Sequence, residues 1–271
     1  MSERDAEMTV TVLGSGTSTG VPEYRCLCDT CQDARNNGSR NARTRPSIHV
    51  EIEGRFLQFD TGPNFLEQID RNGIERIDSV IYTHCHADHI SGTNDLVMPC
   101  RKQDMDMPIY GPDETMRVMQ KNFDYMFSRD TYQGGGVAHL IPHSFSGRFE
   151  IDGLEVVPIP VLHGAVDTQG YRVGSLGYVP DVKVMPEASL ALMEGVELLI
   201  IDGLSFNSRH PTHLCVAESI EISNSLDSPT TYLTHLAHRI DHRNFKEQCD
   251  QQNVDLPEHV ELAFDGMKIT V

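Results

Sequence analysis

The chain has 271 residues, of which 39% are apolar and 23% are charged, and its formal net charge is −18 at pH 7. This composition is ordinary for a globular protein with a large core, and the acidic balance argues against broad nucleic-acid binding, which requires clustered cations. No apolar run approaches the roughly 20 residues that span a membrane, and the polar start of the chain has no signal-peptide core. We therefore expect a cytoplasmic protein without membrane or nucleic-acid partners.

The first quarter of the chain predicts strands joined by turns. Residues 8–13 alternate as an opening strand, followed by a Gly/Ser/Thr loop that could offer N–H groups to an anion. Residues 47–51 and 56–59 predict a hairpin about Glu53-Gly54 that leads to Asp60. The four arginines between Arg35 and Arg45 are either a solvated loop or a rim that attracts anions.

The middle of the chain predicts alternating helices and strands. We expect a helix over 64–72, a buried strand over 79–82, a helix from Asp88 to about Met98, a strand from Pro108 and a helix over 113–122. Residues 123–140 look irregular, with Gly134, Gly135 and Gly136 in a row. This segment is either a flap over a cleft or a surface excursion.

The second half repeats these element types. We expect strands over 154–161, 171–178, 196–201 and 230–233, helices over 186–193, 214–225 and 243–251, and a closing hairpin of 261–264 and 268–271 about Asp265-Gly266. Strands and helices mixed without a regular alternation suit two packed sheets with helices outside. The prediction is one α+β domain over residues 1–271, an αββα four-layer sandwich.

Seven cysteines in a chain without an export signal favour reduced thiols and metal ligation over disulfides. Three of them form the cluster Cys26-x-Cys28-x-x-Cys31. Three thiolates make up most of a tetrahedral zinc site but lack a fourth local ligand, and a redox cluster is the rival interpretation. The isolated thiols are predicted to be core or incidental residues: Cys85, Cys100, Cys215 and Cys249.

Four metal-capable side chains follow the buried strand over 79–82, namely His84, His86, Asp88 and His89. On an extended chain His84 and His86 point the same way, because side chains alternate. A helical turn beginning near Asp88 would swing Asp88 and His89 to a second direction. One loop can therefore serve two adjacent ions of zinc-like character; the alternative is a His-rich surface loop.

The pattern His84-x-His86-x-Asp88-His89 resembles the signature of the metallo-β-lactamase superfamily. The run from Leu13 to Pro22, Leu-Gly-Ser-Gly-Thr-Ser-Thr-Gly-Val-Pro, together with the three-cysteine cluster, resembles its branch that contains the phosphoribosyl cyclic phosphodiesterase (PhnP-type). The resemblance extends from about Thr9 to the C-terminus. It implies an αββα fold that carries one or two metal ions between two sheets.

The resemblance also implies a ligand set for two divalent ions, zinc or manganese. One ion would be held by His84, His86 and His163, the other by Asp88, His89 and His235, with Asp181 bridging. Asp181 departs from the usual Gly/Ser-Asp-Thr context, since it stands in Pro180-Asp181-Val182. His238 would complete a structural zinc site with Cys26, Cys28 and Cys31, and Asp60 would orient a ligand histidine or simply form a turn.

The expected reaction is hydrolysis of a small or cyclic phosphodiester. Two cations lower the pKa of a bridging water to give hydroxide and stabilise the charge on phosphorus. The resemblance places His213 as the general acid for the leaving group and, with Asp88, as a catalytic residue; a non-catalytic histidine is the alternative. Other open functions are an RNA-processing nuclease, a thioester or lactam hydrolase, and a non-catalytic metal-binding protein. The sequence does not determine the oligomeric state, and a homodimer is one possible state.

Overall fold

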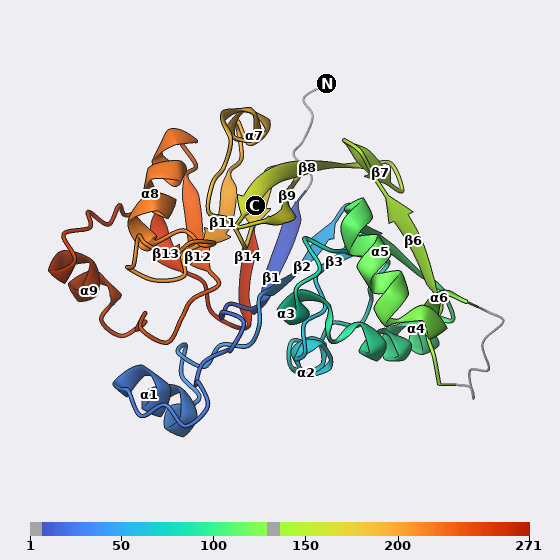
Figure 1. The fold of residues 1–271 in the computed structure, drawn as a ribbon, viewed down its shortest axis with the longest axis horizontal. Helices are drawn as coiled ribbons and strands as arrows, with labels where there is room; N and C mark the ends of the chain where they lie inside the picture. The colour runs from blue at the N-terminus through green and yellow to red at the C-terminus, as the bar shows by residue number, and fades with distance from the viewer. Residues whose placement is uncertain (1–6, 129–135) are drawn as a thin grey trace. The chain divides into compact units, whose positions relative to one another are not determined.

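A computed structural model describes residues 7–128 and 136–271 of the chain (Figure 1). These residues form two compact units. The first comprises Ser47–Ser146, Gly266–Val271 and the described part of Met1–Leu13, and the second comprises Gly14–Pro46 and Gly147–Asp265. Each unit contains one mixed β-sheet with helices, which confirms the α+β class. The single domain over the whole chain stays a prediction.

The sheet of the first unit has, among the described residues, the strand order β14-β1-β2-β3-β4-β5-β6. Its strands are β1 (Met8–Gly14), β2 (Ser47–Ile52), β3 (Arg55–Phe59), β4 (Ser79–Ile81), β5 (Met107–Gly111), β6 (Leu140–Ser144) and β14 (Met267–Thr270). The predicted hairpin is confirmed, since β2 and β3 pair antiparallel. Its turn residues Glu53 and Gly54 have φ values of 50° and 76°, as a two-residue hairpin turn requires.

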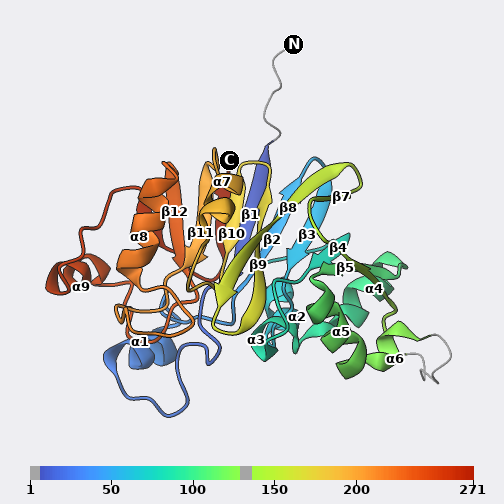
Figure 2. The same cartoon turned by 45° about the horizontal axis from the view of Figure 1, so that its top comes forward.

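Figure 2 shows helices alongside the strands of this sheet. Buried apolar side chains such as Phe65, Leu96 and Met119 pack them together. They are α2 (Phe65–Arg71), α3 (Ala87–Ile90), the 3-10 helix η1 (Thr93–Leu96), α4 (Val97–Gln103), α5 (Asp113–Asn122) and α6 (Asp124–Phe127). The single helix predicted from Asp88 to Met98 is wrong, because the chain breaks at Gly92. There the backbone N–H donates to Thr61 O at 2.8 Å, and a Cβ would lie 2.0 Å from Gly62 O.

The sheet of the second unit has, among the described residues, the order β13-β12-β11-β10-β9-β8-β7. Its strands are β7 (Phe149–Ile151), β8 (Leu154–His163), β9 (Val166–Val173), β10 (Leu176–Val179), β11 (Leu198–Asp202), β12 (Thr230–Thr234) and β13 (Val260–Leu262). Strand β11 is buried at every position and parallel to both neighbours, as is typical of a central parallel strand. The single strand predicted over 171–178 is wrong, because the chain reverses at Gly174 (φ 54°) between β9 and β10.

The helices of the second unit are α1 (Asp29–Asn37), α7 (Glu187–Leu192), α8 (Val216–Ser225) and α9 (Phe245–Gln251). Figure 1 shows α8 in orange alongside β11 and β12. Its N-terminus carries a reciprocal cap, in which Glu218 Oε2 accepts the Cys215 N–H at 2.8 Å. This cap fixes where the preceding loop, which carries His210 and His213, enters the helix.

The closing hairpin predicted about Asp265-Gly266 is wrong. Strand β13 pairs parallel with β12, whereas β14 pairs antiparallel with β1 in the other sheet. A turn does form at Asp265–Gly266, but the two strands that it joins pair with different neighbours, and the Asp265 carboxylate binds two loops. It accepts the backbone N–H groups of Ser15 and Thr44 at 2.9 and 2.8 Å.

The structure bears on one of the two segments that the sequence left open, the arginine segment over 35–45, and describes only part of the other, 123–140. Arg43 is fully buried and donates to the carbonyls of Ala237 and Ile240 at 3.1 and 2.8 Å, so at this residue both the solvated loop and the anion rim are wrong. The predicted flap over 123–140 contains residues 129–135, which lie outside the described residues. In the part of the chain described, no helix has the length and apolarity needed to cross a membrane.

Candidate metal centre

The structure brings together the four metal-capable side chains that follow β4. The ring centroids of His84 and His86 are 4.4 Å apart and those of His84 and His89 are 4.2 Å apart. His86 immediately precedes α3, and Asp88 lies in its first turn, with Oδ2 3.5 Å from His89 Nε2. The extended exit and the helical turn therefore group His84, His86, Asp88 and His89 within one loop, as the sequence predicted.

Asp60 lies beneath this loop, within the same unit. Its carboxylate is fully buried and accepts the Thr83 N–H at 2.9 Å, the Thr83 hydroxyl at 2.9 Å and His89 Nδ1–H at 2.7 Å. Burial raises the pKa of the Asp60 carboxyl, against the opposing effect of His89 and Thr83. Because Nδ1 of His89 faces Asp60, its Nε2 is left facing Asp88, which is how a buried carboxylate orients a metal-ligating imidazole.

The second unit gathers Asp181, His163 and His235 at its strand ends, together with His213 from the loop before α8. Asp181 Oδ1 lies 3.2 Å from His235 Nε2 and 3.9 Å from the Nε2 atoms of both His163 and His213. His163 is the last residue of β8, and its Nδ1–H donates to Thr212 O at 2.7 Å. His235 follows β12 in the left-handed region (φ 57°), an unusual backbone for a non-glycine residue that surrounding contacts must hold in place. Although Asp181 follows Pro180 instead of the usual Gly or Ser, its carboxylate still lies within this cluster.

The sequence reasoning missed Asp202, which holds His213. Its Oδ2 accepts His213 Nδ1–H at 2.7 Å and the Val182 N–H at 3.1 Å, and Oδ1 accepts the Leu204 N–H at 3.1 Å. The His213 ring stacks on the His235 ring, with centroids 4.4 Å apart. Asp202 ends the apolar strand β11 as Asp60 follows β3, so the strand-end pattern that singled out Asp60 could have found it.

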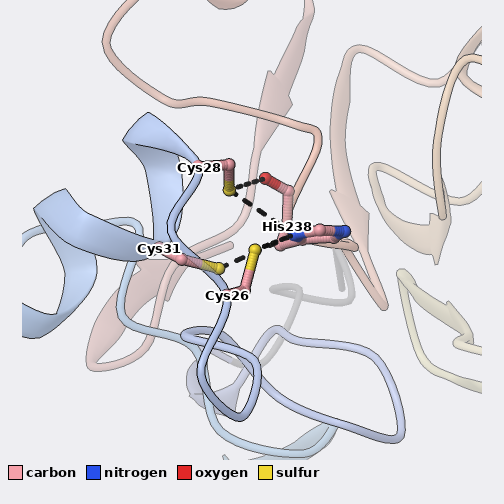
Figure 3. Close-up of side chains that lie close together, drawn as sticks. All are labelled: Cys26, Cys28, Cys31 and His238. Carbon is pink, nitrogen blue, oxygen red and sulfur yellow. Dashed lines mark hydrogen bonds between the residues drawn. The ribbon is translucent and has the colours of Figure 1, made fainter.

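The three-cysteine cluster meets His238 in the second unit (Figure 3). His238 Nδ1 lies 3.3, 3.5 and 3.6 Å from the sulfurs of Cys26, Cys28 and Cys31. Zn–S and Zn–N bonds of about 2.3 and 2.0 Å at a tetrahedral angle place sulfur and nitrogen about 3.5 Å apart, so this donor set fits zinc. Burial raises the pKa of the Cys31 thiol to about 12, so its thiolate form needs a compensating cation.

The second nitrogen of His238 also has a partner. Its Nε2 lies 3.4 Å from Glu23 Oε2. A carboxylate on the far side of a metal-facing imidazole fixes the ring orientation and its tautomer. This contact is a further reason why the cluster fits a metal ion better than a redox role.

Comparison with known proteins places the chain in a family. A family model described as a β-lactamase superfamily domain matches residues 55–236. The chain belongs to the β-lactamase superfamily. Within it, a crystal structure described as a new diphosphatase from the PhnP family is 35% identical, has a TM-score of 0.85, and is covered over 97% of its length by 98% of this chain. The resemblance to the PhnP branch is therefore confirmed.

Two further relatives show how far this family extends. An octanoyltransferase of Porphyromonas gingivalis is 28% identical over 97% of this chain, which spans only about half of that protein's length (52%). The structure of Zn²⁺-bound PqqB from Methylobacterium extorquens is 21% identical with a TM-score of 0.73, covering 96% of this chain and 99% of that one. These likenesses confirm the metallo-β-lactamase αββα fold class, and membership of the family supports a metal-binding hydrolase.

Proposed function

We propose that this protein is a dinuclear metal-dependent phosphodiesterase that hydrolyses small or cyclic phosphodiesters. The observation that carries the proposal is the pair Asp202–His213 beside Asp181, His163 and His235. An imidazole held by a carboxylate next to candidate metal ligands suits a reaction whose leaving group needs a proton. The 35% identity with a PhnP-family diphosphatase supports a substrate with phosphorus–oxygen bonds.

The proposed ligand set follows the superfamily pattern. One ion would be held by His84, His86 and His163 and the other by Asp88, His89 and His235, and Asp181 would be shared. Imidazole and carboxylate donors suit zinc or manganese. Two divalent ions, when bound, supply an activated water and neutralise the charge that develops on the phosphoryl oxygens. A third ion, a structural zinc, is proposed for Cys26, Cys28, Cys31 and His238.

His213 is the proposed proton donor. Because Asp202 accepts Nδ1–H, the ring presents Nε2 towards Asp181, and the transferable proton is the one on Nε2. The backbone N–H groups of Val182 and Leu204 hold Asp202 in place, so the direction of His213 Nε2 is set before substrate arrives. General acid catalysis requires such a donor within hydrogen-bond reach of the leaving oxygen.

The test is a substrate panel on protein whose metals have been counted. We expect about three metal ions per chain and turnover of an alkyl phosphodiester and a cyclic phosphodiester, which a chelator abolishes and Zn²⁺ or Mn²⁺ restores. A diphosphate, an acyl thioester and a β-lactam complete the panel. Higher kcat/KM for any of these three than for every diester, in metal-replete protein, would refute the phosphodiesterase assignment.

An acyl thioesterase is the second candidate function. It is favoured by the 28% identity with the octanoyltransferase, which covers 97% of this chain. Nearly half of that relative lies outside the match, so its name belongs to the whole protein. A preference for an octanoyl thioester over the diesters in the same panel would decide in favour of this candidate.

A further inference from the structure

The candidate ligand His89 depends on a residue that adopts a strained backbone. Asp60, which fixes Nδ1 of His89, has φ 58° although it is not a glycine. Such a conformation is strained and persists only when surrounding contacts hold it in place. The contacts that hold the Asp60 backbone therefore decide how the imidazole is presented.

Two buried side chains from β2 and β3 hold that backbone. The side-chain amide of Gln58 donates to Asp60 O at 2.8 Å, to Phe59 O at 3.1 Å and to the Ser47 hydroxyl oxygen at 2.7 Å. The Ser47 hydroxyl in turn donates to Phe59 O at 2.9 Å or to Asp60 O at 3.2 Å. Both side chains are fully buried. Buried hydrogen bonds restrict the positions of the groups that they join, and losing one leaves a polar group unsatisfied at a cost in stability.

Gln58 faces a histidine on the neighbouring strand. Its partner in the β2–β3 register is His49, which is 1% exposed. Burial lowers the pKa of His49 to about 4, with the Gln58 side chain acting in the opposite direction. His49 is therefore a neutral imidazole on the strand opposite Gln58, whose side-chain amide binds the Asp60 carbonyl.

We propose that Gln58, assisted by Ser47, is a positioning residue for the metal-binding loop: it locks the left-handed backbone of Asp60 so that the Asp60 carboxylate holds His89 with Nε2 directed to the metal. Neither Gln58 nor Ser47 touches the metal-capable side chains, so each acts through Asp60. This inference rests on the proposed metal ligation by His89, but not on the identity of the substrate.

The test compares Gln58→Met with a matched control, Gln103→Met. Gln103 lies in the same unit and also binds backbone through its side-chain amide, accepting Ile77 N–H at 2.8 Å and donating to Ile77 O at 2.7 Å. Both substitutions keep the side-chain volume and should lower the melting temperature. Only Gln58→Met should weaken the affinity for Mn²⁺, roughly 10- to 100-fold, as expected when the partner of a ligand is disturbed.

Mn²⁺ alone is the probe, since thiolates bind it poorly and the cysteine cluster should not compete. Free Mn²⁺ is counted by electron paramagnetic resonance at increasing protein concentration. Ser47→Ala, a milder change, should shift the affinity in the same direction by a smaller factor. Unchanged Mn²⁺ affinity in Gln58→Met, or equal losses in Gln58→Met and Gln103→Met, would overturn the proposal.

A second readout needs no metal at all. Long-range ¹⁵N–¹H correlation spectra of metal-free protein should show His89 protonated at Nδ1 in the wild type and in Gln103→Met. In Gln58→Met the same signal should show exchange between tautomers, and a spectrum identical to the wild type would contradict the proposal. A protein that passes both tests yet hydrolyses no phosphodiester would disprove the proposed function and leave this inference standing.

Discussion

Replacing His213 with Ala should separate proton donation from metal binding. The ring is 8% exposed and stacks on His235, and its hydrogen bond to Asp202 is 2.7 Å long. After the substitution Asp202 still accepts the backbone N–H groups of Val182 and Leu204, both at 3.1 Å. No buried carboxylate is stranded, so the free energy of unfolding should fall by only about 1–3 kcal/mol and the metal content should not change.

The kinetic cost should depend on the leaving group. An alkoxide is strongly basic and needs a proton in the transition state, whereas p-nitrophenolate leaves readily without one. General acid catalysis typically contributes about 10²–10⁴-fold, which corresponds to about 3–5 kcal/mol of transition-state stabilisation. We expect the alkyl diester to lose that factor in His213→Ala, and the aryl diester to lose far less.

The assay is kcat/KM for both diesters in the wild type, His213→Ala and Asp202→Asn, with metals counted in each. Asp202→Asn should show the same leaving-group dependence at smaller magnitude, because the ring loses its fixed orientation. His242→Ala is the control, a half-buried imidazole that binds Ala263 O and should change both diesters alike. Equal losses for the two diesters in metal-replete His213→Ala would mean that His213 binds the phosphate instead of delivering a proton.

Three further predictions concern the scaffold. Cys28→Ser should lose one tightly bound zinc and lower the melting temperature, because structural-site binding energy is also folding energy; Cys249→Ser, a buried thiol outside the cluster, should keep all its zinc. Gly92→Ala should cost about 1–3 kcal/mol of stability in urea unfolding, since its Cβ would lie 2.0 Å from Gly62 O, whereas Gly147→Ala meets nothing within 4 Å and should be neutral. Burial lowers the pKa of His49 to about 4, so protonation of the unfolded chain should lower the free energy of unfolding by on the order of 3 kcal/mol as pH falls from 6.5 to 4. A His49→Leu variant with the same acid sensitivity would contradict this.

The sequence alone was enough to predict most of the local elements and the grouping of the two metal-capable motifs. Helix α5 begins and ends at the predicted residues, because an acidic first turn follows Pro112 and the apolar spacing is regular. The β2–β3 hairpin was predictable because Glu53-Gly54 supplies the left-handed turn. The spacing of His84, His86, Asp88 and His89 was enough to predict their grouping, since strand and helix geometry decide it within six residues.

Only the tertiary structure decided which distant segments meet. Alternation in the last residues predicted two strands correctly, but not that β13 joins β12 while β14 joins β1. Likewise, nothing local marks Gln58 as the partner of the Asp60 carbonyl, or Arg43 as a buried donor to the carbonyls near His238. The physical reason is that a two-residue period fixes which side chains share a face, whereas pairing depends on contacts such as Asp265 with Ser15, which are 250 residues apart.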